Sequence, residues 1–447
     1  MSNLVDMSRK LARGKVTSRE LVDRCLSAIA DSEGEGSRAF LTVYEERAKA
    51  EADHIDQARA KGLHVPSFAG IPISIKDLFD VAGEVTRAGS RVLDEEAAAA
   101  FDCVIVSRLR RAGFVLLGKT NMTEFAYSGL GMNAHFGTPL NPYDRPSGRI
   151  PGGSTSGGAV SVADGMTAAT IGTDTGGSCR IPAAFCGIVG FKSTSKRVPR
   201  DGVFPLSKTL DSIGPLANSV SCCAVLDSVL SGGEGLDEDS FPEIGLRLGV
   251  LEGYVTEKLD DHVTASYQAA LTRLSQRGVT LKPITINELG ELPHINRNGG
   301  LVGVDAYAWH RTYLESRAEH YDPWVRARFE AGKAQSAADY IELIEQRARL
   351  IAAVRKKAHM FDALALPTVQ ITPPTIASLS DPELSNPINL LCLRNTAVGN
   401  FLDRPAISIP CHDLGTAPVG FMLMADTGQD RRLLAIARGI EYAIRSG

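Results

Sequence analysis

Two serine-containing clusters flanked by glycine lie between Pro151 and Lys192. The first is Gly152–Gly158, with the sequence GGSTSGG, and the second is Gly176–Ser178, with the sequence GGS. Glycine beside serine allows backbone torsions that other residues avoid, and it leaves no side chain to block a substrate carbonyl or an amide N–H. A serine hydroxyl becomes a nucleophile when a neighbouring group takes its proton. The two clusters therefore indicate a serine hydrolase.

The second cluster also offers a set of backbone donors. Consecutive N–H groups can converge on one oxygen, which is the arrangement that an oxyanion hole needs. The donors here are the N–H groups of Thr175, Gly176, Gly177 and Ser178. The GxSxG elbow of histidine-dependent hydrolases is absent. A Gly/Ser-rich stretch is often a flexible linker, but the flanks of this one, at 168–171 and 181–191, are apolar, which a linker does not require.

A lysine ends an apolar run at residues 68–77. The run reads FAGIPISIKD, and its β-branched residues predict a strand that ends near Lys76. Desolvation at such a position lowers the pKa of the ammonium group and leaves a neutral amine that can act as a base. The alternative for a single lysine of this kind is a snorkelling or salt-bridged surface group.

A literal match to the phosphate-binding P-loop begins at Gly113 and continues, after four residues, with Gly118, Lys119 and Thr120. In a P-loop the four intervening residues form a loop that follows a strand. Here Phe114–Leu117 reads as the strand itself. We therefore interpret Lys119 as a strand-end residue that contacts backbone or a carboxylate, and nucleotide binding is the disfavoured alternative.

Length and composition are average for a soluble globular protein. The chain has 447 residues, of which 44% are hydrophobic and 22% charged, and its net charge of −4 gives no electrostatic case for nucleic acid or an anionic membrane. No apolar run approaches about 18 residues, and the N-terminus has no apolar signal region, so we expect a cytoplasmic protein. The eight cysteines form no CxxC pair. We expect buried free thiols, no metal site and no cofactor.

Alternating segments predict a mixed α/β sheet covered by helices on both faces. A capping box at Thr17–Glu20 opens the first predicted helix. Further predicted helices cover 44–61, 104–111, 337–360 and a segment from Gln429, and predicted strands cover 68–77, 114–117, 246–251, 362–367 and 406–410. Residues 198–218 read as a loop, and about 253–360 as a helical insertion that shapes the substrate pocket.

Several sequence blocks, taken in order, resemble the amidase signature family. GIPISIKDLFDVAG resembles the lysine segment of that family, and GKTNMTEFAYSG followed by NAHFGTPLNP resembles its next blocks. PGGSTSGG and GTDTGGSCRIPAAFCGIVGFK resemble its two serine segments, and RPAISIPC and PVGFMLMA its closing strands. The resemblance implies a single α/β domain over 1–447 with a signature core at about 60–216. It also implies hydrolysis of a small carboxamide to a carboxylate and ammonia or an amine through a serine acyl-enzyme.

The resemblance implies roles for single residues as well. Ser178 matches the nucleophile, Ser154 the bridging serine with an unusual cis peptide bond, and Lys76 the base. These roles are chemically consistent, because a neutral buried lysine can take a serine proton through an intermediate hydroxyl. Asp174 and Arg180 flank the nucleophile, and the family pattern implies that they pair and brace its loop.

The segment at 125–133 predicts the wall of a substrate pocket, because it is aromatic and apolar with few charges. Tyr127 and Met132 belong to this wall, and Cys179, which follows the proposed nucleophile, is assigned to the same pocket. A desolvated carboxylate without a cationic partner is very unfavourable. We therefore expect a neutral, partly apolar small amide, such as an aryl- or indole-acetamide-like compound.

Two alternatives stay open. Arg87, or an arginine of the helical insertion such as Arg297 or Arg311, reaches the site and binds a substrate carboxylate. Alternatively, the chain is the amidase (glutaminase) subunit of a glutamine-dependent tRNA amidotransferase, since that family shares all three catalytic positions. We favour a stand-alone amidase for two reasons. The chain is somewhat short for the amidotransferase subunit, and it only partly matches the GGSSGGSAAAV pattern of the serine segment in that family. We expect a small-molecule amide as partner, no nucleic acid and no membrane, and a homodimer stays open.

Overall fold

The computed structural model describes residues 3–233 and 245–445, in which eleven strands form one sheet. The strands are β1 (Phe40–Val43), β2 (Pro72–Lys76), β3 (Val115–Thr120), β4 (Ala169–Asp174), β5 (Val189–Lys192), β6 (Ser212–Ala217), β7 (Arg247–Glu252), β8 (Thr280–Thr285), β9 (Ala363–Pro367), β10 (Ala406–Pro410) and β11 (Gly420–Met424). They are ordered β1-β3-β2-β4-β6-β5-β10-β11-β9-β7-β8. Parallel pairs (β2 with β3 and β4) and antiparallel pairs (β4 with β6) both occur, so the sheet is mixed as predicted.

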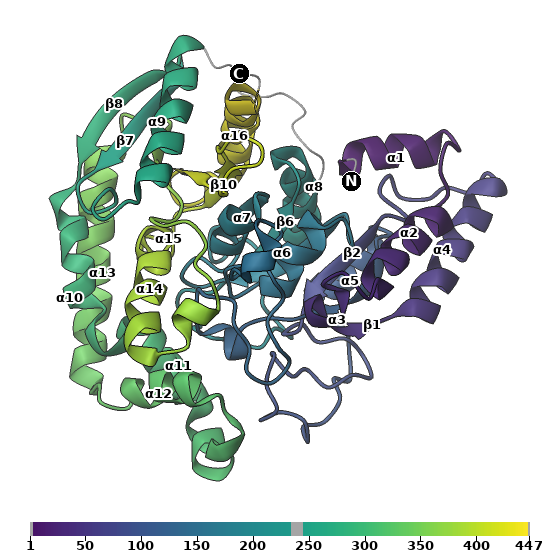
Figure 1. Ribbon diagram of the computed structural model, residues 1–447, viewed down its shortest axis with the longest axis horizontal. Helices are drawn as coiled ribbons and strands as arrows, with labels where there is room; N and C mark the ends of the chain where they lie inside the picture. The colour runs from purple at the N-terminus through teal and green to yellow at the C-terminus, as the bar shows by residue number, and fades with distance from the viewer. Residues whose placement is uncertain (1–2, 234–244, 446–447) are drawn as a thin grey trace.

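The described helices connect and cover these strands (Figure 1). They are α1 (Leu4–Ala12), α2 (Ser18–Ala30), α3 (Gly36–Ala39), α4 (Glu45–Ala60), α5 (Val104–Arg111), α6 (Ser156–Ala163), α7 (Arg180–Cys186), α8 (Val220–Ser231), α9 (Asp261–Gln276), α10 (Leu292–Ile295), α11 (Gly300–Ser316), α12 (Pro323–Gly332), α13 (Ala337–Ala358), α14 (Pro382–Arg394), α15 (Thr396–Phe401) and α16 (Asp430–Arg445).

Helices cover both faces of the sheet, as β3 demonstrates. Side chains alternate between the two faces of a strand. Leu116 packs into the main core with Ile105 and Leu109 of α5, whereas Val115 and Leu117 pack on the other face against α2 and α4. The predicted α/β class, with a mixed sheet covered by helices on both faces, is therefore confirmed.

Strands from the two halves of the chain lie side by side in this sheet. β5 pairs with β10, with Ala406 opposite Lys192, and β10 continues the sheet towards β11 and β9. Figure 1 shows the C-terminal helix α16 beside β10, and α16 also contacts α8. This continuity makes the chain one α/β domain.

Most predicted elements lie where the sequence placed them. The capping box is present, because the Thr17 side chain accepts from the backbone of Glu20 and the Glu20 side chain accepts from the backbone of Thr17. The residues of the P-loop match belong to β3, where Lys119 is 1% exposed and lies 3.6 Å from the Glu84 carboxylate. A strand that pairs on both sides cannot wrap a phosphate, so the interpretation of Lys119 as a residue that contacts a carboxylate is confirmed.

Two expectations about local structure were wrong. Residues 198–218 are not all loop, because β6 lies within them and pairs with β4 over six residues. The sequence did not predict this strand because proline has no N–H to donate to a sheet, so Pro215 was read as a loop residue. The strand tolerates Pro215 because pairing with β5 is confined to Leu216 and Ala217. The stretch 253–360 is also not purely helical, since it contains the edge strand β8.

All eight cysteines are free and buried, as the absence of CxxC pairs predicted. In residues 3–233 and 245–445, no helix has both the length and the apolar character needed to cross a membrane.

Candidate active site

Two parallel strands bring Lys76 and the Ser178 loop to one edge of the sheet. β2 and β4 pair in parallel, with Ile75 opposite Ile171. The carboxyl ends of neighbouring parallel strands meet at the same edge, where loops commonly carry functional groups. β2 ends at Lys76, and β4 ends at Asp174 and continues directly into the Ser178 loop.

The side-chain nitrogen of Lys76 is buried between two hydroxyls. Nζ donates to Ser154 Oγ at 2.8 Å and to Thr173 Oγ1 at 3.0 Å. Lys76 and Ser154 are 0% exposed, and Ser178 is 4% exposed. The structure thus joins two of the three predicted catalytic side chains directly.

Burial sets the ionisation of Lys76. It lowers the pKa of Lys76 to about 8, although the charges of Asp174 and Asp211 act in the opposite direction. A lysine with this pKa loses its proton in the weakly alkaline range, and the neutral amine can then accept a proton from a hydroxyl.

The loop that carries Ser154 is fixed by its own backbone. The Gly153 N–H donates to the Gly129 carbonyl at 2.8 Å, and the Thr123 N–H donates to the Ser154 carbonyl at 3.1 Å. The Gly153–Ser154 peptide bond is cis, as the family resemblance implied. Glycine is required at 153 because a Cβ there would lie 2.6 Å from the Gly131 nitrogen.

The Ser178 loop packs against the first serine loop and presents free donors. The Thr155 N–H donates to the Ser178 carbonyl at 3.3 Å. In the described chain, the N–H groups of Gly176, Gly177 and Ser178 donate to no other protein atom. Gly177 has φ 139°, and a Cβ there would lie 2.2 Å from Thr396 Oγ1, so the loop requires glycine. Three consecutive donors are therefore available to a ligand oxygen.

Asp174 and Arg180 form a buried ion pair behind this loop. Arg180 Nη2 lies 2.9 Å from Asp174 Oδ1, and both side chains are 0% exposed. The carboxylate also accepts from the Cys179 N–H at 3.0 Å and from Asn400 Nδ2 at 2.8 Å. Burial raises the pKa of Asp174, but the attraction of Arg180 and these hydrogen bonds outweigh it and hold the pKa at about 2.

Sequence reasoning missed several contacts of the two loops. Thr173, which holds Lys76, could have been found because it stands in the GTDTGGS block one position before Asp174. Asp211 accepts from Thr175 Oγ1 at 2.5 Å and ties the Ser178 loop to the chain after residue 200. Thr396, which donates to the Gly176 carbonyl at 2.6 Å, comes from α15 and gave no local signal.

The three residues predicted for the substrate pocket have different surroundings. Tyr127 is partly buried against Phe329, with ring centroids 5.2 Å apart, and burial raises its pKa to about 12. Met132 packs, partly buried, into a hydrophobic cluster of α7 and α14. The assignment of Cys179 was wrong, because its fully buried thiol donates to the Gly214 carbonyl at 3.5 Å and so faces the core.

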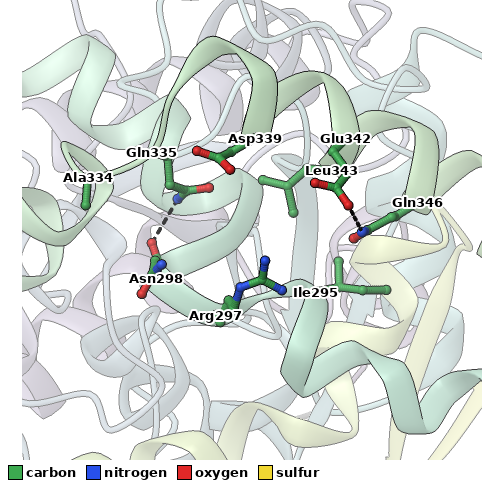
Figure 2. Close-up of a pocket in the computed structure, with 9 residues that line it drawn as sticks. All are labelled: Ile295, Arg297, Asn298, Ala334, Gln335, Asp339, Glu342, Leu343 and Gln346. Carbon is green, nitrogen blue, oxygen red and sulfur yellow. Dashed lines mark hydrogen bonds between the residues drawn. The ribbon is translucent and has the colours of Figure 1, made fainter.

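Of the arginines that the sequence offered as carboxylate ligands, two have contacts elsewhere and the third is exposed. Arg87 forms a partly exposed ion pair with Asp94 at 2.8 Å. Arg297 lines a cavity of about 70 Å³, where Figure 2 shows it facing side chains of α13, and no predicted catalytic residue lines that cavity. Arg311 is exposed on α11.

Comparison with known proteins places the chain in a family. The family model described as Amidase matches residues 20–434. The 2-amino-5-chloromuconic acid deaminase of Comamonas testosteroni is 34% identical over 450 residues, covering 100% of this chain and 96% of that protein. A glutamyl-tRNA(Gln) amidotransferase subunit of Synechococcus sp. (strain WH7803) is 33% identical over 477 residues, covering 98% and 96%. The chain belongs to the amidase family.

A solved structure agrees with this assignment. The crystal structure of an amidase superposes with a TM-score of 0.90 at 30% identity, covering 99% of this chain and 100% of that one. Family and fold together define an amidohydrolase that acts on carbon–nitrogen amide bonds.

The Asp174–Arg180 pair generates a stability prediction. Asp174→Asn removes the negative charge and leaves the buried Arg180 uncompensated, which should lower the free energy of unfolding by about 3–5 kcal/mol. Urea denaturation followed by circular dichroism measures this change. As a control, Asp6→Asn breaks the exposed Asp6–Arg9 pair and should leave the denaturation midpoint unchanged. Equal midpoints for the two variants would contradict the bracing role.

Proposed function

We propose that this chain is a stand-alone amidase that hydrolyses a small carboxamide through an acyl-enzyme on Ser178. The observation that carries the proposal is the buried 2.8 Å contact between Lys76 Nζ and Ser154 Oγ, in a loop bonded to the carbonyl of Ser178. Burial lowers the pKa of Lys76, so part of the lysine is neutral and can take a proton through the adjacent Ser154 hydroxyl. Amide cleavage by a serine needs a nucleophile activated in this way.

The proposed reaction moves one proton along a chain of three groups. Neutral Lys76 takes the hydroxyl proton of Ser154, and Ser154 takes that of Ser178 as Ser178 Oγ bonds to the substrate carbonyl carbon. The N–H groups of residues 175–178 stabilise the resulting oxyanion. The carbon–nitrogen bond then breaks as the leaving nitrogen takes a proton from Ser154, and Ser154 regains a proton from the Lys76 ammonium, which returns Lys76 to its neutral form. Water attacks the acyl-enzyme by the same proton path and releases the carboxylate.

The remaining expectations are proposals of the same kind. The reaction as written needs no cofactor, and in residues 3–233 and 245–445 no group of three His, Cys, Asp or Glu side chains is placed to hold a metal ion. Cytoplasmic location, a small-molecule amide as partner and the open choice between monomer and homodimer stay predictions.

A second candidate function is supported by one comparison. The glutamyl-tRNA(Gln) amidotransferase subunit is about as similar to this chain as the deaminase is, at 33% against 34% identity. If the chain has that role, it should co-purify with two further subunits and show glutaminase activity only with them. Ammonia release by the purified chain alone from an amide other than glutamine favours the stand-alone amidase.

Replacing the nucleophile tests the proposed chemistry. Ser178→Ala removes the atom that forms the acyl bond, so ammonia release should fall to background while the circular dichroism spectrum stays that of the parent. Ser156→Ala is the matched control, because Ser156 is also buried and lies two positions after Ser154, while its hydroxyl donates to the Asn121 carbonyl at 3.5 Å. Near-normal turnover by Ser178→Ala would exclude Ser178 as the nucleophile.

The pH dependence tests the base. Because burial lowers the pKa of Lys76 to about 8, kcat/KM should rise with pH through an apparent pKa near 8 and then level off. The rate rises with pH because only the deprotonated amine of Lys76 can accept a proton.

A second buried lysine supplies the control for this experiment. Burial also lowers the pKa of Lys192 to about 8, but its amine donates to the Ser193 and Arg404 carbonyls. The residual activity of Lys192→Met should keep the same pH limb. A rate maximum at about pH 5, or loss of the rise in kcat/KM with pH in Lys192→Met, would reject Lys76 as the base.

A further inference from the structure

A pocket of about 590 Å³ opens beside the site, and no predicted pocket residue lines it. It lies between the ends of β4 and β6, the loop at 200–208 and helix α11. Its lining residues are Asp80, Thr173, Arg200, Asp201, Gly202, Val203, Phe204, Pro205, Lys208, Asp211, Ile213 and Trp309. A volume of this size suits a small organic ligand.

Two lining residues connect this pocket to the proposed catalytic groups. Thr173 Oγ1 accepts from Lys76 Nζ at 3.0 Å, so the pocket wall is one hydrogen bond from the proposed base. Asp211 accepts from Thr175 Oγ1 at 2.5 Å, and Thr175 begins the set of oxyanion donors. A group bound in the pocket therefore adjoins both the proton relay and the oxyanion loop.

Aromatic rings form one wall of the pocket. The Phe204 and Trp309 rings meet edge to face, 6.1 Å apart at an interplanar angle of 87°. Phe204 is fixed from behind, since its ring lies 5.4 Å from that of Phe125. Trp309 is fixed by Lys208, whose ammonium lies 4.7 Å over the indole centroid. Trp309 nevertheless stays 42% exposed, so a ligand can cover the free part of its ring.

Most charged groups of the lining already have partners in the protein. Asp211 accepts from the Leu206 and Ser207 N–H groups at 3.0 and 3.1 Å. Arg200 Nη1 donates to the Asp211 carbonyl at 3.0 Å, and Asp80 accepts from the Thr86 hydroxyl at 2.6 Å. The lining carries two cationic and three acidic side chains, so it offers no net positive charge to an acidic substrate.

We propose that this pocket binds the aryl group of a neutral arylalkanoic amide, with Trp309 and Phe204 as specificity-determining residues. The inference rests on the proposed amidase function and names its substrate class. The aryl group stacks against the exposed indole face, and the scissile amide extends past Thr173 towards Ser178. Stacking against such a wall is favourable for any flat apolar group and needs no substrate charge.

Steady-state kinetics with three amides test this pocket. The probes are phenylacetamide, acetamide and N-benzylacetamide, which carry an aryl group on the acyl side, no aryl group, or an aryl group on the amine side. The wild-type chain should prefer phenylacetamide to acetamide. Trp309→Ala should reduce that preference, measured as the ratio of the two kcat/KM values, by about 10–100-fold, with most of the loss in KM. Trp309→Phe should restore most of the ratio because it keeps a flat ring.

A control variant and the contrary outcomes complete the design. Phe101→Ala removes an aromatic ring that is 82% exposed and lines no part of this pocket, so it should leave the ratio as in the wild type. An unchanged ratio in Trp309→Ala, or a loss confined to N-benzylacetamide, would overturn the assignment while leaving the amidase proposal intact. Absence of ammonia from every amide, with the wild-type chain folded, would instead count against the proposed function itself.

Discussion

The chemistry of the site depends on one constraint, namely that a buried lysine amine is surrounded by hydroxyls and not by a bonded carboxylate. Lys76 Nζ contacts Ser154 Oγ and Thr173 Oγ1, so burial is free to disfavour its charged form. The neighbouring strand offers a comparison within the same sheet. Lys119 is equally buried, but its Nζ lies 3.6 Å from the Glu84 carboxylate.

Keeping negative charge away from Lys76 explains much of the surrounding architecture. Successive residues of a strand face opposite sides of the sheet, so Asp174 points away from the side on which Thr173 meets Lys76. There the carboxylate is paired with the Arg180 cation and accepts a hydrogen bond from Asn400. The same alternation therefore gives Lys76, the proposed base, a hydroxyl on one side of β4 and gives the Ser178 loop a buried ion pair as support on the other.

The sequence was informative wherever a signal lay within a short stretch. The capping box at Thr17, helix α5, the end of β2 at Lys76 and the two serine loops could all be predicted, because composition and spacing carry them locally. β6 was missed because Pro215 is typical of a loop. Only the structure shows that β6 pairs with β5 through Leu216 and Ala217, the two residues that follow Pro215. β8 was missed because most of its residues are exposed.

Contacts between distant segments could not be predicted either. Thr396 and Asn400 reach the Ser178 loop from α15, and no local pattern in a single sequence links residues so far apart. The assignment of Cys179 to the pocket was wrong because, after the buried Ser178, the next side chain points into the core towards the Gly214 carbonyl.

A single carboxylate links the loop at 200–208, which lines the proposed aryl pocket, to the Ser178 loop. Asp211 accepts from the N–H groups of Leu206 and Ser207, close to the Phe204 ring, and it also accepts from the Thr175 hydroxyl beside the oxyanion donors. Because one buried group holds both segments, neither can shift without straining hydrogen bonds to the other. An aryl group bound against Phe204, as proposed, would therefore pack on a segment that shares the Asp211 carboxylate with the Ser178 loop.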